Sequence, residues 1–161
     1  MIQLVLKRAG TVIDVFGAGG EPLASLPLLG QSRGTVVPLR GREAEPLEPG
    51  HYRVAGWNRA AAQLELADLD LATETRLIDA GSARRAAGER VLDVRGIGAP
   101  TGGLGGRTGV AIHGDGENDA PPGGGLRVAR AGLLRLIDVL ASDPGHGTVV
   151  LSVAGEPYPL S

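Results

Sequence analysis

Hydrophobic and polar residues alternate along much of the first half of the chain. Alternation with a period of two is typical of β-strands that pack one face against a core. It predicts early strands at 2–6, 12–16, 23–29, 52–57 and 64–66. Further along, it predicts short buried strands at 91–94 and 110–113 and a closing strand at 148–153. Segments rich in glycine, proline and polar residues predict turns or loops between them, chiefly at 17–20, 30–50 and 96–106.

The alternation changes phase after Leu66. Leu64 and Leu66 share one phase, whereas the leucine and threonine positions from Leu69 to Leu77 share the other. Because a change of phase moves the buried face of a strand, a bulge or a hairpin corner is expected at Ala67–Asp68. The stretch 82–88 is expected to be a connector.

A longer period governs residues 128–142 and predicts a helix there. Its apolar residues recur at a spacing of 3.6 and form one buried face: Leu133, Leu136, Ile137 and Leu140. The sequence Asp143-Pro144-Gly145 would end this helix. Many short strands and one late helix in 161 residues predict a mainly β (β-rich α+β) fold, with a single domain spanning residues 1–161.

Composition narrows the chemistry. The chain has no cysteine, which excludes disulfides, thiolate metal sites and a cysteine nucleophile. The formal net charge is −2, acids and bases are interleaved, and aromatic residues make up 2%, so no nucleic-acid partner is expected. No apolar run approaches the roughly 18–20 residues that cross a bilayer, so no membrane insertion is expected. The N-terminus lacks an export signal, so we expect the chain to be cytoplasmic as synthesised and then associated with a virion or other assembly.

Two loops carry parts of ligand-binding motifs. The loop 101–108 has threonine and arginine where a phosphate-binding loop needs glycine and lysine, and a predicted strand follows it instead of a helix. In the acidic loop, Asp115, Glu117 and Asp119 alternate as in calcium loops, but Leu126 occupies position twelve, where a bidentate acid is required. We therefore expect no metal and no cofactor.

His113 is the histidine in the most suggestive place. The other two, His51 and His146, lie too far from it in sequence for a linear zinc motif. No serine lies in a Gly-x-Ser-x-Gly elbow, so serine hydrolase chemistry has no support. His113 ends a predicted buried strand just before a glycine. Two interpretations are open: an internally bonded structural histidine, or a ring that faces a cleft.

The second half of the chain carries a series of motifs in a suggestive order. Gly-Arg-Thr-Gly-Val-Ala-Ile-His-Gly at 106–114 is followed by a polar loop, Gly-Gly-Gly-Leu-Arg-Val at 123–128, the helix and Gly-Thr-Val-Val-Leu at 147–151. This order resembles the catalytic domain of L,D-transpeptidases, which cross-link peptidoglycan stems through a cysteine acyl-enzyme. That family has Ile-His-Gly, a variable loop, Ser-His-Gly-Cys-Ile-Arg, a helix and a Gly-Thr-x-Val strand. The resemblance implies a β-sandwich or barrel.

The resemblance also implies a degenerate site. His113 and Gly114 stand on the family's His-Gly, Gly124 on the glycine before the nucleophile and Arg127 on the arginine after it. Pro122, Gly123 and Gly125 stand where the family has serine, histidine and cysteine. A second register, on Ala129 to Gly132, also lacks cysteine and histidine and takes up the start of the helix. Cysteine acyl transfer needs a thiolate and a base within hydrogen-bond reach, so no catalytic residue is expected in either register.

From these features we expect a pseudoenzyme: a non-catalytic L,D-transpeptidase-like domain that serves as a structural or peptidoglycan-associated binding module, such as a phage tail or virion component. Its expected partners are other protein subunits of an assembly and peptidoglycan stem peptides. The residues expected to bind are His113, Asp115, Glu117 and Arg127. The alternative is an active peptidoglycan-modifying enzyme with non-cysteine chemistry at His113.

Overall fold

A computed structural model describes the parts of the chain that form the fold. These are residues 2–6, 11–17, 20–29, 46–47, 50–69, 76, 86–87, 104, 107–142, 148–153 and 158–159. Six sequence predictions lie wholly or largely outside these ranges. They are the strand at 91–94, the shifted phase after Leu69, the connector at 82–88, the loops at 30–50 and 96–106, and the helix stop at 143–145.

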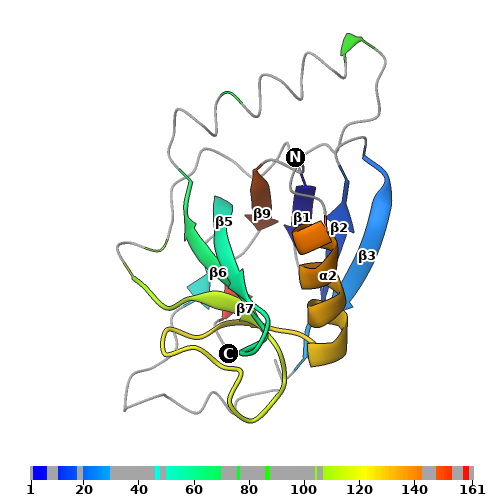
Figure 1. Cartoon of the computed structure of the whole chain (residues 1–161). Coiled ribbons are helices and arrows are strands. Elements are labelled where there is room, and N and C mark those ends of the chain that lie inside the picture. The colour runs from blue at the N-terminus through cyan, green and yellow to red at the C-terminus, as the bar shows by residue number, and fades with distance from the viewer. Residues whose placement is uncertain are drawn as a thin grey trace.

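Eight strands form one mixed sheet (Figure 1). Their bounds are β1 (Ile2–Leu6), β2 (Val12–Phe16), β3 (Pro22–Pro27), β5 (Gly50–Asn58), β6 (Gln63–Asp68), β7 (Ala111–His113), β8 (Gly125–Arg127) and β9 (Val149–Val153). The order across the sheet is β3-β2-β1-β9-β5-β6-β7-β8. A separate two-stranded pair joins β4 (Pro46–Leu47) to β10 (Tyr158–Pro159).

Strand β9 holds the two halves of the sheet together. It lies parallel to β1 on one side and antiparallel to β5 on the other, so the last long strand is inserted between the first half and the middle of the chain. All five of its residues are buried. The predicted closing strand is therefore confirmed, and most of the sheet depends on pairing between segments far apart in sequence.

The two edges of the sheet meet at one end. Leu28, just past β3, forms an antiparallel bridge with Val128, just past β8, and the Leu29 N–H donates to the Arg127 carbonyl over 2.8 Å. The sheet thus curls into a half-barrel. Helix α2 (Arg130–Ser142) starts at this junction and lies along β3 (Figure 1). Gly132 permits the close approach, because a Cβ there would lie 3.2 Å from the Leu26 Cδ2.

The core is aliphatic, as the composition predicts. The interior faces of the strands and the four apolar residues of α2, Leu133, Leu136, Ile137 and Leu140, form one buried cluster. Tyr52 is the largest fully buried side chain among the described residues. The predicted mainly β fold with a late helix is confirmed. No helix in the described ranges is long and apolar enough to span a membrane.

Two local predictions need correction, and the start of the helix can be stated more closely. The helix starts at Arg130, two residues after the expected start near 128, because Val128 is held in its bridge to Leu28. Ala67 and Asp68 both pair with β5 in regular register, so the bulge or hairpin corner predicted at these two residues is wrong. The irregularity lies on the partner strand between Val54 and Gly56. Strand β8 occupies glycine-rich residues for which the sequence predicts no strand. Its extended conformation comes from pairing with β7.

Candidate functional site

The register of β6, β7 and β8 brings three polar residues into one row. His113 is paired with Gln63 on one side and with Arg127 on the other. Paired residues in neighbouring strands point to the same face, and consecutive residues point to opposite faces. The preceding row, Leu64, Ile112 and Leu126, is fully buried in the core. The polar row therefore lies on the outer face of the half-barrel.

His113 is buried on this face. Its exposed fraction is 2%, and its Nδ1–H donates to the Gly114 carbonyl over 2.9 Å. The pKa of His113 lies below the ordinary value of 6.5, chiefly because burial disfavours the charged imidazolium. The bond to Gly114 opposes this effect. The charge of Arg127 lowers the pKa further, and the charge of Asp119 raises it. The result is an imidazole held neutral at pH 7.

Asp119 forms the centre of a buried polar network beside His113. It is 3% exposed, and Arg130 Nη1 donates to its Oδ1. The Gly116 N–H donates to Oδ2 over 2.9 Å, and Gln63 Nε2 donates to the main-chain carbonyl over 2.8 Å. The network ties the loop to the sheet and to α2, so both oxygens of this carboxylate are used within the chain.

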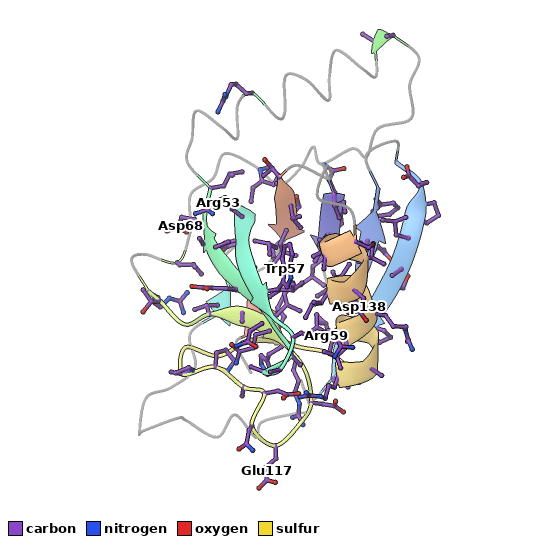
Figure 2. The ribbon with its side chains drawn as sticks, in the orientation of Figure 1. Arg53, Trp57, Arg59, Asp68, Glu117 and Asp138 are labelled. Atoms are coloured by element: carbon purple, nitrogen blue, oxygen red, sulfur yellow. The ribbon has the colours of Figure 1, made fainter. Side chains whose placement is uncertain are left out.

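The turn between β5 and β6 covers the same region. The Gly114 N–H donates to the Ala62 carbonyl over 2.9 Å, and Arg130 Nη2 donates to the Ala60 carbonyl over 3.1 Å. A Cβ at Gly114 would lie within 3.2 Å of Ala62, Arg130 and Asp119 atoms, so the protein itself fills the space beside the His-Gly pair. Arg59 Nε also reaches Asp138 on α2 over 2.9 Å (Figure 2).

The other two acids of the loop have different roles. The Arg130 N–H at the start of α2 donates to Asp115 Oδ1 over 2.9 Å, and this bond is the main reason that the pKa of Asp115 is lowered. Ala129, just before the helix, has no side chain that can accept such a bond, so Asp115 caps the helix from a distance in sequence. Glu117 lies at the loop tip and points away from the sheet (Figure 2). Among the described residues, no group of three or more histidine, aspartate or glutamate side chains is placed to hold a metal.

The glycines at 123–125 are packed directly against the neighbouring backbone, which leaves no room for side chains. A Cβ at Gly123 would lie 2.6 Å from the Thr108 carbonyl oxygen, and one at Gly125 would lie 1.7 Å from the Ala111 carbonyl oxygen. Gly124 and Gly125 also have φ values of 73° and 149°, which side chains rarely tolerate. The Ala111 N–H donates to the Gly124 carbonyl over 3.1 Å. Gly125, the position at which the resemblance would place a cysteine, thus lies on a backbone that leaves no room for a Cβ.

Arg127 differs from the other cations around His113. It is partly buried, and its carbonyl accepts the bond from Leu29. Within the described part of the chain, its guanidinium makes no hydrogen bond or ion pair. Arg130 pairs with Asp119, Arg59 pairs with Asp138, and Arg107 Nε donates to the Leu104 carbonyl. Arg127 therefore has donors available for a ligand.

The structure brings together His113, Gly114 and Arg127, places Gly123 to Gly125 beside them, and sends Glu117 away from them. Sequence reasoning missed Arg130 and Gln63, and it considered Asp119 only as part of an incomplete calcium-loop pattern. The only signal for Asp119 was its place in the alternating acids. Comparison with known proteins finds no family model that matches the chain. It also finds no curated protein similar to it.

Proposed function

We propose that the chain is a non-catalytic L,D-transpeptidase-like domain that serves as a structural or peptidoglycan-binding module within a larger assembly, such as a phage tail or virion. Its partners are other subunits of that assembly and peptidoglycan stem peptides. The motif order at 106–128 and the β-rich architecture support the resemblance, and the geometry at Gly125 supports the absence of catalysis.

The single observation that carries the proposal is the position of Gly125. A nucleophile at this position needs a Cβ, and that atom would overlap the Ala111 carbonyl oxygen at 1.7 Å. To admit a side chain, β8 would have to separate from β7, with which it pairs over three residues. The backbone thus excludes a nucleophilic side chain at position 125, whichever residue the sequence were to place there.

The alternative, non-cysteine chemistry at His113, has weaker support. A general base must come within hydrogen-bond reach of the proton that it removes. His113 is 2% exposed, its Nδ1 proton is used by the Gly114 carbonyl, and the neighbouring acid Asp119 is occupied by Arg130. These contacts favour the structural interpretation of the histidine.

Two measurements on the full chain test the proposal. In the first, the protein is incubated with muropeptides, with and without divalent cations, and the products are analysed by mass spectrometry beside an L,D-transpeptidase that retains its cysteine. We expect no mass change, and a new cross-linked or hydrolysed product would overturn the non-catalytic assignment.

The second measurement tests the module itself. The protein is sedimented with intact sacculi, and the native complex or particle that contains it is isolated from its source. We expect the chain to sediment with sacculi or to be present in the isolated assembly in a fixed ratio to other subunits. A chain that stays in the supernatant and occurs in no assembly would contradict the proposed role.

A further inference from the structure

Among the described residues around His113, all polar side chains but one bond to groups of the chain itself. Asp119, Arg130 and Gln63 bond to one another or to main-chain groups, and Asp115 caps α2. Arg127 is partly buried at the end of the row Gln63–His113–Arg127, and in the described ranges no side chain or carbonyl accepts from its guanidinium. A partly desolvated guanidinium without an acceptor gains free energy from any anion that reaches it.

The two acids of the neighbouring loop, Asp115 and Asp119, are bonded to groups other than Arg127. Asp115 feels the positive charge of Arg127, but its Oδ1 accepts from the first N–H of α2, and that backbone bond contributes more to its lowered pKa than Arg127 does. Asp119 uses both oxygens on Arg130 and Gly116. The acids are thus fixed by other partners and do not form a hydrogen bond with Arg127.

We infer that the Arg127 guanidinium binds a carboxylate of the ligand at the end of this polar row. A guanidinium presents two parallel N–H groups that match the two oxygens of a carboxylate. The inference rests on the proposed binding role of the domain and names the chemistry that its ligand must carry. For a stem peptide this is a free carboxylate, at the C-terminus or on a side chain.

His113 provides a reporter for this site. Arg127 lowers the pKa of the buried imidazole. An anion that neutralises Arg127 removes this effect, so a bound carboxylate raises the pKa of His113. A ligand held elsewhere on the surface leaves the imidazole resonances unchanged, which separates binding at Arg127 from weak binding at other arginines.

The test is an NMR titration of the His113 imidazole in the full chain. Three probes are compared: N-acetyl-D-alanyl-D-alanine, its C-terminal amide, and N-acetylglutamate α-amide, which carries only a side-chain carboxylate. We expect the first or third probe to shift the His113 resonances in a saturable way and to raise its pKa, whereas the neutral amide causes no shift. A shift from the first probe alone identifies a C-terminal carboxylate as the preferred source.

Matched variants locate the effect. Arg127→Gln removes the charge and is expected to weaken probe binding at least tenfold, whereas Arg53→Gln, on a distant exposed part of β5, is expected to bind as the wild type does (Figure 2). Each variant is compared with its own probe-free spectrum. Equal shifts from the amide, equal affinity in Arg127→Gln, or no saturable shift with any probe would overturn the inference.

Sedimentation with sacculi separates this inference from the proposed function. If the wild-type protein sediments and Arg127→Gln sediments equally well, the binding role stands and the carboxylate site is wrong. If the carboxylate probes bind at Arg127 but neither sacculi nor an assembly retains the chain, the site stands and the proposed role is wrong.

Discussion

Two segments that flank His113 are held in place by opposite means. The glycines at 123–125 approach β7 so closely that a Cβ at Gly125 would overlap the Ala111 carbonyl oxygen. The acidic loop at 115–119 is held by side chains, with Asp119 bonded to Arg130 and Asp115 bonded to the start of α2. One segment depends on the absence of side chains, and the other depends on their charge.

The difference explains how motif residues can be present without a motif's chemistry. In the glycine segment, no nucleophile can be added without moving the backbone. In the acidic loop, Asp115 caps α2 and Asp119 is one half of an ion pair with Arg130. Asp115 and Asp119 therefore serve the fold here, whereas the Arg127 guanidinium has no acceptor among the described residues.

The largest effect is expected when a side chain is added to the glycine segment. We expect Gly125→Cys to lower the free energy of unfolding by about 4 kcal/mol or more, because the new Cβ meets a backbone carbonyl that cannot swing away. The measurement is urea denaturation followed by circular dichroism. The matched control is Gly56→Ala in β5, where a Cβ meets nothing within 4 Å.

The control is expected to change the free energy of unfolding by no more than about 1 kcal/mol, since Gly56 has space for the methyl group. A Gly125→Cys variant as stable as the control would show that β8 can move away from β7. In that case the absence of a nucleophile would no longer be a property of the backbone.

The acidic loop responds to the loss of charge. Asp119→Asn leaves Arg130 without its anion and is expected to lower the free energy of unfolding by about 2–3 kcal/mol, less than for a fully buried pair because the Arg130 side chain is 39% exposed. Glu117→Gln, at the exposed loop tip, is the control and is expected to change it by less than about 0.5 kcal/mol. If both variants lowered the free energy of unfolding by similar amounts, the burial of Asp119 would not account for its contribution to stability.

Sequence periodicity could predict the elements whose buried face is evident from the spacing of their own apolar residues. Strands β1, β2 and β9 follow from alternation, and α2 follows from its four apolar residues. Strand β8 could not be predicted, because Gly123-Gly124-Gly125 has no strand preference and takes its conformation from β7. The bridge between Leu28 and Val128 joins residues 100 positions apart and has no local signal.

The candidate site was predictable in position but not in its contacts. The resemblance predicts that His113 and Arg127 belong to one site, and the register of β7 and β8 places them side by side. It could not predict that Arg130 forms an ion pair with Asp119, because that pairing depends on the direction in which α2 leaves the sheet. Nor could it reveal that the turn at Ala60–Ala62 covers Gly114, since β5 and β6 carry that turn from an earlier part of the chain.

The buried imidazole offers a pH-dependent test of the same region. Because the folded pKa of His113 lies below 6.5, the unfolded chain binds a proton first as the pH falls, and the folded state loses stability through that range until His113 itself is protonated. We expect the wild type to lose stability between pH 7 and 5 with a slope that is steeper than in His113→Gln by at most about 1.4 kcal/mol per pH unit. Parallel slopes would show that His113 titrates as it does in the unfolded chain. Urea denaturation at each pH gives both slopes.

The smallest effect is expected at the exposed pair between the turn and α2. The Arg59 and Asp138 side chains are 60% and 56% exposed, so water and salt screen their attraction even though two nitrogen atoms of Arg59 bond to the carboxylate. We expect Asp138→Asn to lower the melting temperature only slightly at low salt and not at all in 1 M NaCl, as measured beside Arg135→Gln on the same helix. Its clearer effect should be local: faster hydrogen exchange of the Gly114 amide, which is bonded to Ala62 in the turn. If Asp138→Asn instead destabilised the protein as much as Asp119→Asn does, the exposed ion pair would contribute as much stability as the partly buried one. Burial of Asp119 would then not explain how the acidic loop is held, and only the glycine segment would be accounted for by its local structure.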